Sequence, residues 1–229
     1  MGFDSEQWIG ELVGRLEEEF GDRVLFIGHT GSYARGEATE ESDVDVNIVL
    51  DRLTMDDLDA YRHIIRSMPH RDKACGFICG REEMKAWPAH ELFQFTQGCK
   101  LLRGSLDGLI ATPGEEDIAD SIRNLASSVY HLCCHNYLFS EETDDAAEGM
   151  KDAYKVAFFA MQELVFLQER KYVPTKRELL LHLDAEDRRV LETCMHWAEL
   201  EDDRRDRPEH YFSLLKDWSS RMLGSVRKA

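Results

Sequence analysis

The sequence predicts an α+β protein in which a small mixed sheet with flanking helices is followed by an antiparallel helical bundle. Two observations lead to this prediction. Before residue 112, strand-like apolar runs alternate with amphipathic helices, whereas every periodic segment after it has helical spacing. Between these regions, Thr112 can cap a helix, Pro113 suits its first turn, and Glu115 takes the acidic position of a capping box. We therefore expect two domains, residues 1–111 and 112–229.

Local signals define the elements of the first half. A helix is predicted where a capping residue precedes apolar residues at helical spacing, and a strand where apolar residues run together or alternate. In chain order, the predicted elements are a helix that Asp4 caps and Gly21 ends, a strand over 24–27, a strand from Asp43 to Leu50, a helix that Thr54 caps and that ends before Pro69, a weak strand over 73–79, a short helix over 90–97 and a strand over 100–104.

The second half is predicted to contain four or five helices. Apolar stripes at helical spacing cover residues 118–133 and 150–165, and the acidic stretch Ser140–Asp145 is interpreted as the loop between them. Further helices are expected after Thr175, after Asp184 and from Pro208. Short connections between amphipathic helices favour an antiparallel bundle.

The composition indicates a protein with packed cores and a strongly acidic surface. Hydrophobic residues make up 43% of the chain, which excludes global disorder. The 45 acidic residues outnumber the 28 basic ones, so the formal net charge is −17. A surface of this sign repels nucleic acid. We therefore expect no nucleic-acid partner, and small ligands that are neutral or cationic wherever no metal ion offsets the charge.

Cysteine usage and the lack of long apolar segments favour a cytoplasmic protein. None of the six cysteines forms a Cys-x-x-Cys pair, and we interpret all six as free thiols in a reducing compartment. The first residues lack the basic and apolar regions of a signal peptide. No apolar stretch approaches the roughly 20 residues that span a bilayer, so no membrane partner is expected.

The stretch from Gly28 to Leu50 carries the strongest functional signal. Closely spaced glycines predict tight turns whose backbone N–H groups face an anion, and Ser32 adds a hydroxyl donor. Because side chains alternate along a strand, Asp43 and Asp45 are expected on one face. Paired carboxylates of this kind are typical ligands of divalent cations. The stretch therefore predicts a phosphoryl or nucleotidyl transfer site.

These residues also resemble a known signature. Gly31-Ser32, Ala34-Arg35-Gly36 and Ser42-Asp43-Val44-Asp45 are similar to the motif of the polymerase-beta-like nucleotidyltransferase superfamily, in the style of its kanamycin-type, lincosamide-type and minimal members. The resemblance implies a nucleotidyltransferase domain over residues 1–111. It further implies an enzyme that moves a nucleoside monophosphate from a nucleoside triphosphate, in the first instance ATP, to a hydroxyl of a small-molecule acceptor.

The resemblance also implies roles for individual residues. Gly31 and Ser32 would hold the β- and γ-phosphates, while Asp43 and Asp45 would be the catalytic carboxylates that bind Mg²⁺. Arg35 would either contact the phosphates or brace the loop, and both readings stay open. In the second half, the pair Lys151 and Lys155, one helical turn apart, would either reach the triphosphate or solvate a helix face.

One feature of the superfamily is not found in the sequence. Catalytic relatives commonly carry a third carboxylate on a later strand, and the weak strand over 73–79 holds none, although Asp72, Glu82 and Glu83 flank it. Two alternatives therefore remain open. One is a nucleotide-binding or regulatory protein that has lost catalysis, and the other is an antitoxin-like enzyme that adenylylates a protein. A homodimer is left open as the assembly.

Overall fold

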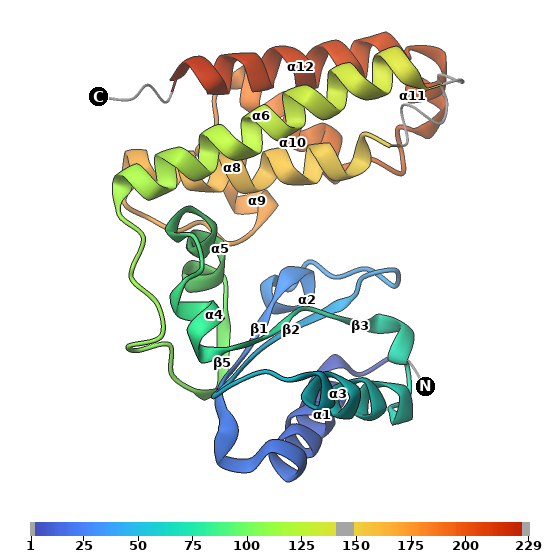
Figure 1. Cartoon of the computed structure of the whole chain (residues 1–229). Helices are drawn as coiled ribbons and strands as arrows, with labels where there is room; N and C mark the ends of the chain where they lie inside the picture. The colour runs from blue at the N-terminus through green and yellow to red at the C-terminus, as the bar shows by residue number, and fades with distance from the viewer. Residues whose placement is uncertain (1–2, 141–148, 226–229) are drawn as a thin grey trace. The chain divides into compact units, whose positions relative to one another are not determined.

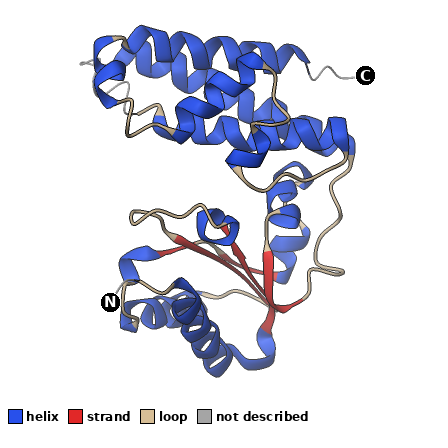
Figure 2. Cartoon of the chain, turned by 180° about the vertical axis from the view of Figure 1, so that it is seen from behind, coloured by secondary structure: helices blue, strands red, loops and turns tan. Residues whose placement is uncertain are grey.

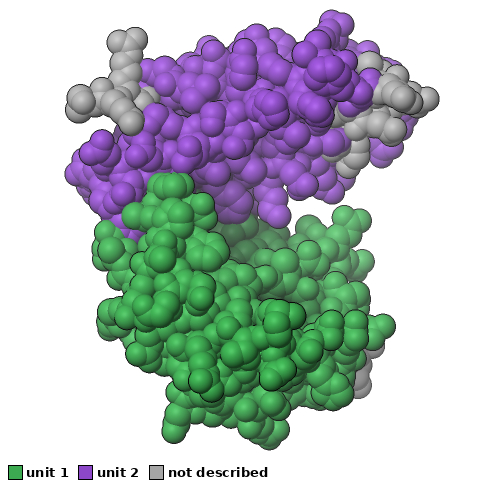
Figure 3. Space-filling view, in the orientation of Figure 1, with its two compact units in different colours: residues 1–112 green, residues 113–229 purple. Residues whose placement is uncertain are grey.

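The computed structural model describes residues 3–140 and 149–225 of the chain. The chain divides into two compact units, Met1–Thr112 and Pro113–Ala229 (Figure 3). The first unit contains the whole sheet, and all regular elements described in the second unit are helices. The predicted fold class, a small mixed sheet with flanking helices followed by a helical bundle, is confirmed.

The first unit contains five strands and a set of mostly short helices. Its elements are α1 (Ser5–Phe20), η1 (Gly21–Arg23), β1 (Val24–Thr30), α2 (Gly31–Arg35), β2 (Val44–Leu50), α3 (Met55–Ser67), η2 (Arg71–Lys73), β3 (Ala74–Cys75), β4 (Ile78–Gly80), α4 (Arg81–Lys85), η3 (Ala89–Glu91), α5 (Leu92–Gln97) and β5 (Lys100–Gly104). The strands form one sheet in the order β3-β2-β1-β5, and β4 also pairs with β2 (Figures 1 and 2). Strand β1 is antiparallel to both neighbours, whereas β2 is parallel to β3 and β4.

Helices α1 and α3 cover one face of this sheet. The side chain of Asp4 caps α1 by accepting a 3.0 Å hydrogen bond from the N–H of Gln7, and Gly21 ends the helix at a positive φ of 53°. Apolar residues spaced along α1 and α3 then pack against alternate residues of β2, which are fully buried. The members of this core include Trp8, Leu12, Leu16, Val44, Val46, Ile48, Leu50 and Ile64.

The opposite face of the sheet carries a smaller core at one end and polar residues at the other. Phe26 and Val49 pack there against Met84 of α4 and against Leu92 and Phe95 of α5. Because residues of β2 alternate between the faces, the side chain of Asp45 shares the face of Val49. The smaller core therefore covers the C-terminal end of β2, around Val49, and does not cover the N-terminal end, where Asp45 lies on the same face.

Several details of the first unit differ from the expectations. Gly28 lies inside β1, which runs three residues further than predicted, so it does not form a turn. The predicted phosphate loop contains the short helix α2, closed by Gly36 at a φ of 73°. The weak strand divides into β3 and β4 because Gly76, at a φ of 117°, lies so close to the backbone of Val46 that a Cβ would overlap the Val46 carbonyl oxygen.

The helix that opens the second unit begins later than predicted. Helix α6 starts at Glu115, so Gly114 rather than Thr112 is the capping residue. The acid that completes the cap is Asp117, which accepts a 2.8 Å hydrogen bond from the Gly114 N–H, and not Glu115. The prediction was wrong because the sequence contains two overlapping sets of capping residues, Thr112 with Glu115 and Gly114 with Asp117, and the structure uses the second set.

The second unit is a bundle built around one apolar core. Its helices are α6 (Glu115–Phe139), α8 (Lys151–Glu169), α9 (Lys176–Leu179), α10 (Ala185–Met195), α11 (Glu201–Asp206) and α12 (Pro208–Ser225). Thr175 and Asp184 cap α9 and α10 as predicted, whereas α11 was not expected. Most of the predicted loop Ser140–Asp145 lies outside the described residues. No helix in the described part of the chain is long and apolar enough to span a bilayer.

A partly buried ion pair lies at the end of the sheet that is remote from Asp45 and connects β1 to α3. Arg23, just before β1, donates to both carboxylate oxygens of Asp57 at 2.7 and 2.9 Å and to Asp51 at 3.0 Å. Asp57 also accepts from Thr54 in the capping box that starts α3. The bonds from Arg23, followed by those from Thr54, hold the pKa of Asp57 well below its ordinary value, against the effect of desolvation.

We expect Asp57→Asn to destabilise the protein by about 1–3 kcal/mol at pH 7, because Arg23 loses its charged partner. The folded-state pKa of Asp57 lies below the ordinary value of 3.8. Its contribution is therefore complete above that value and is lost as the pH falls through the folded pKa. Urea unfolding should show a stability difference between wild type and variant that narrows under acid conditions. Asp59→Asn, which removes an exposed acid of the same helix, should change little, and a pH-independent difference for Asp57→Asn would contradict the assignment.

Candidate active site

The start of α2 lies directly against the carboxylate of Asp45. The antiparallel pairing of β1 with β2 puts Thr30, the last residue of β1, opposite Asp45. The chain then turns at Gly31 with a φ of 76°. An ideal Cβ on Gly31 would overlap Oδ2 of Asp45 and lie 2.7 Å from its Cγ. The position therefore requires glycine both for its backbone conformation and for the space that Asp45 occupies.

The backbone at Gly31 and Ser32 has the properties of an anion-binding turn. The first N–H groups of a helix lack acceptors within the helix, and Gly31 and Ser32 are the first two residues of α2. In the described part of the chain, no protein group is hydrogen-bonded to the Ser32 hydroxyl. The carbonyl of Ser32 instead accepts from the Glu37 N–H at 2.9 Å, which closes the far end of the turn.

The two candidate carboxylates stand where β2 begins. Val44 and Val46 are buried in the core beneath α1 and α3, so Asp45, which lies between them on β2, faces the other side of the sheet. Asp43 is the residue directly before the strand. Asp45 is half-buried and Asp43 is exposed. The chain before them is held by Lys73, whose ammonium donates to the carbonyls of Glu40 at 2.6 Å and Ser42 at 3.2 Å.

A buried amide connects the carboxylate strand to the turn, and the sequence interpretation missed it. Asn47, two residues after Asp45 on the same face of β2, is 5% exposed. Its Nδ2 donates a 2.9 Å hydrogen bond to Oγ1 of Thr30, immediately before Gly31. A polar residue in an otherwise apolar strand was the available signal, because such a residue needs a buried partner.

Strand β3, which pairs with β2 beside Asp45, carries the thiol of Cys75 at the position where the superfamily commonly has a third carboxylate. The parallel register of β2 and β3 puts Cys75 beside Asp45. Cys75 is exposed, but partial desolvation raises its pKa, and the carboxylates of Asp45 and Asp43 raise it further. Glu82 and Glu83 follow Gly80, which pairs with Leu50, roughly 16 Å along β2 from Asp45. These two acids therefore do not supply a third carboxylate beside the pair.

Arg35 is engaged with its own loop. Its side chain is 9% exposed, and its Nε donates to Glu37 at 3.2 Å. Of the two readings that the sequence left open, this ion pair favours bracing of the turn.

Lys151 and Lys155 are both exposed on α8 and belong to the second unit. The two lysines therefore lie in the second unit, whereas Asp43 and Asp45 lie in the first, and neither unit contains both groups.

The metal prediction rests on the carboxylate pair alone. Within residues 3–140 and 149–225, no group of three or more His, Cys, Asp or Glu side chains is arranged to hold a metal ion. Asp43 and Asp45 nevertheless offer hard oxygen donors beside an anion-binding turn, and this donor set fits Mg²⁺, which commonly binds one or two carboxylates plus phosphate oxygens. All six cysteines are free.

Comparison with known proteins defines the class of the first unit. Residues 9–75 match the family model described as a nucleotidyltransferase domain. The chain also shares its fold with the spectinomycin adenyltransferase AAD(9) from Enterococcus faecialis, crystallised with ATP and spectinomycin. The TM-score is 0.59 at 12% identity, and the match covers 97% of this chain and 100% of that one. The chain therefore contains a nucleotidyltransferase domain of the polymerase-beta-like superfamily, and the resemblance read from the sequence is confirmed.

A curated relative gives a closer but shorter match. A protein of Methanocaldococcus jannaschii, provisionally named as a protein adenylyltransferase, is 46% identical over 48 residues, which are 21% of this chain. The match spans 48% of that relative, about half its length. The family match therefore assigns residues 9–75 to a nucleotidyltransferase domain, and the chain spans about half the length of the curated relative that it matches.

We expect Gly31→Ala to abolish nucleotide binding, because the methyl group displaces the Asp45 carboxylate or shifts the turn away from it. The added Cβ at positive φ should also destabilise the protein by about 1–3 kcal/mol. Gly14→Ala is the matched control, since a Cβ at Gly14 meets no atom within 4 Å. Titration with a fluorescent ATP analogue, together with thermal unfolding, tests this. Unchanged binding by a folded Gly31→Ala protein would remove the turn from the site.

Proposed function

We propose that this protein transfers AMP from ATP to a hydroxyl group of a small molecule, in a reaction that depends on Mg²⁺. The contact between Gly31 and Asp45 is the observation that carries the proposal. It joins a turn suited to phosphate groups with carboxylates suited to a divalent cation, at one point of the sheet. Both halves of the contact belong to the segment matched by the nucleotidyltransferase family.

Each residue of the site has a role in this proposal. The backbone N–H of Gly31 and the hydroxyl of Ser32 bind the β- and γ-phosphates, and Asn47 fixes the position of the turn through Thr30. Asp43 and Asp45 would hold Mg²⁺, which when bound neutralises the triphosphate and favours attack on the α-phosphorus. Most of the rate enhancement then comes from positioning and electrostatics. Lys151 and Lys155 would add positive charge from the second unit.

The breadth of the two similarities favours a small molecule as acceptor. The similarity to the spectinomycin adenyltransferase extends over both units, whereas the match to the protein named as a protein adenylyltransferase covers 48 residues. The acidic net charge of −17 favours a neutral or cationic acceptor over a nucleic acid. Spectinomycin, the molecule bound in the related structure, is therefore a first compound to assay.

A second candidate function is nucleotide binding without turnover. The presence of Cys75 at the β3 position beside Asp45 favours it, since a neutral thiol does not replace a carboxylate as a general base. Pyrophosphate release with ATP, Mg²⁺ and a panel of amines, aminoglycosides and candidate protein acceptors separates the alternatives. Binding without release supports the second function, whereas release that requires a protein acceptor supports the antitoxin-like enzyme.

We expect the double variant Asp43→Asn/Asp45→Asn to keep the fold and to bind ATP in the presence of Mg²⁺ at least about tenfold more weakly than wild type. The reason is that Asn removes both charges that attract the cation. Isothermal titration calorimetry with and without Mg²⁺ measures the difference. Asp59→Asn, an exposed acid of α3, is the control and should bind as wild type does. Equal affinity of the double variant and wild type would show that the metal assignment is wrong.

We expect Cys75→Asp to raise the rate of pyrophosphate release by about tenfold or more, because it supplies a carboxylate beside Asp45 on the neighbouring strand. Cys75→Ser is the matched control, since it changes the thiol without adding a charge. Steady-state rates at saturating ATP and Mg²⁺ test the prediction. A rate that falls in both variants would instead indicate that the thiol itself takes part in the reaction.

A further inference from the structure

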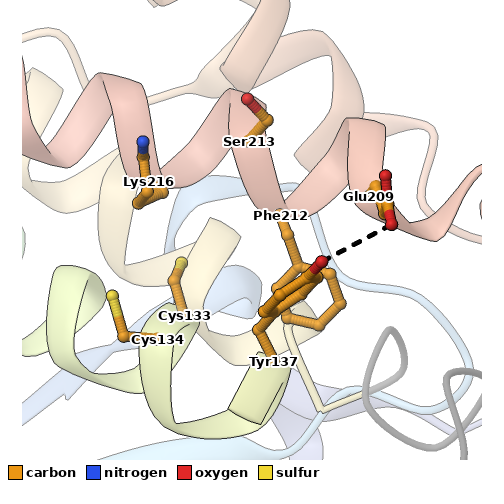
Figure 4. A pocket seen from close by; sticks show the side chains of 7 residues that line it. All are labelled: Cys133, Cys134, Tyr137, Glu209, Phe212, Ser213 and Lys216. Carbon is orange, nitrogen blue, oxygen red and sulfur yellow. Dashed lines mark hydrogen bonds between the residues drawn. The ribbon is translucent and has the colours of Figure 1, made fainter.

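A pocket of about 260 Å³ opens between α6 and α12 in the second unit (Figure 4). Its lining comes from two helices: Cys133, Cys134 and Tyr137 of α6, and Glu209, Phe212, Ser213 and Lys216 of α12. None of these residues belongs to the candidate active site. The volume lies just under the range of about 300–1,000 Å³ that is typical of ligand pockets, so it suits a molecule with one ring.

The inner part of the pocket is apolar and uncharged. The rings of Tyr137 and Phe212 meet edge to face, with centroids 5.4 Å apart and an angle of 69° between their planes. Cys133 is 2% exposed, and burial raises the pKa of its thiol to about 12, so the thiol is neutral at pH 7. An aromatic pair beside a buried thiol offers a surface on which the apolar body of a ligand can be desolvated.

The charged side chains around the pocket leave an excess of one negative charge, that of Glu209. The ammonium of Lys216 lies 2.7 Å from the carboxylate of Asp217, which also accepts from the Ser213 hydroxyl at 3.1 Å, so this cation is neutralised within its own helix. From the described residues, the carboxylate of Glu209 accepts a single long hydrogen bond, 3.4 Å, from the Tyr137 hydroxyl (Figure 4). No Lys, Arg or His in residues 3–140 and 149–225 forms an ion pair with Glu209. One negative charge is therefore left at the mouth of an aromatic pocket.

We propose that this pocket binds a small organic cation, a primary ammonium group attached to an aromatic or aliphatic body. The ammonium pairs with Glu209 and lies against the face of Tyr137, where a cation–π contact adds to the ion pair. The body of the ligand fills the space beside Phe212 and Cys133. The net charge of −17 raises the local concentration of cations at such a pocket. The site is independent of the proposed nucleotidyl transfer.

The test uses 4-fluorophenethylamine as probe and fluorine NMR of the full chain without nucleotide, at low salt, where charge attraction is strongest. We expect saturable binding to wild type and an affinity about three- to tenfold lower in Glu209→Gln. Glu192→Gln is the matched control, because it removes an exposed carboxylate of the same unit outside the pocket. The neutral isostere 2-(4-fluorophenyl)ethanol should bind more weakly than the amine, and to the same extent in both proteins.

A second variant fills the pocket rather than changing its charge. Ser213→Phe, at an exposed position of the rim, should prevent probe binding while the thermal midpoint stays near that of wild type. Three results would overturn the proposal: no saturable binding to wild type, equal binding by Glu209→Gln and Glu192→Gln, or a dimer, measured by light scattering, in which a second copy occupies the pocket and excludes the probe. No ATP or Mg²⁺ is used, so a negative result leaves the nucleotidyl transfer proposal standing.

Discussion

The close approach of Gly31 to the Asp45 carboxylate is the contact on which the rest of the candidate site depends. The pairing of β1 with β2 causes this approach, because it puts Thr30 opposite Asp45 and therefore brings the next residue against the Asp45 carboxylate. Only a residue without a side chain fits there, since a Cβ on Gly31 would overlap that carboxylate. The hydrogen bond from Asn47 to Thr30 fixes the same point from the buried side. The distance between turn and carboxylates is thus set by rigid strands, and such support gives a site more precision than loops do.

Features set by neighbouring residues could be predicted from the sequence. The caps at Asp4, Thr54 and Asp184 occur as expected because each bond joins residues three positions apart. Alternation in β2 correctly separated the buried valines from Asp45, because it depends only on strand geometry, whereas Asp43 lies just before the strand. These signals were sufficient for the fold class and for the face of the sheet on which Asp45 lies.

Features set by pairing between distant segments could not be predicted. The sequence shows that residues 73–79 hold no carboxylate, but only the register of β3 shows that Cys75 is the residue beside Asp45. The break at Gly76 depends on contact with the backbone of Val46, and the role of Asn47 depends on Thr30, 17 positions away. Arg35 was ambiguous for a related reason, because guanidinium groups bind both phosphate and carboxylate and the choice depends on which of them lies near.

Electrostatics connects the remaining parts of the site. Two cations close in sequence to the turn and to β3 are already engaged with the chain itself, Arg35 with the carboxylate of Glu37 and Lys73 with backbone carbonyls. The charge of Arg35 is offset by Glu37, whereas the carbonyls fix the position of the Lys73 ammonium without offsetting its charge. The two candidate carboxylates add negative charge to a chain that is already strongly acidic. In the proposed reaction, a divalent ion at the carboxylates would supply most of the compensation, and the predicted lysines Lys151 and Lys155 would be a further source of positive charge. The predicted metal ion and the predicted lysines would serve the same purpose, because an anionic triphosphate binds in an acidic site only when positive charge there offsets the repulsion.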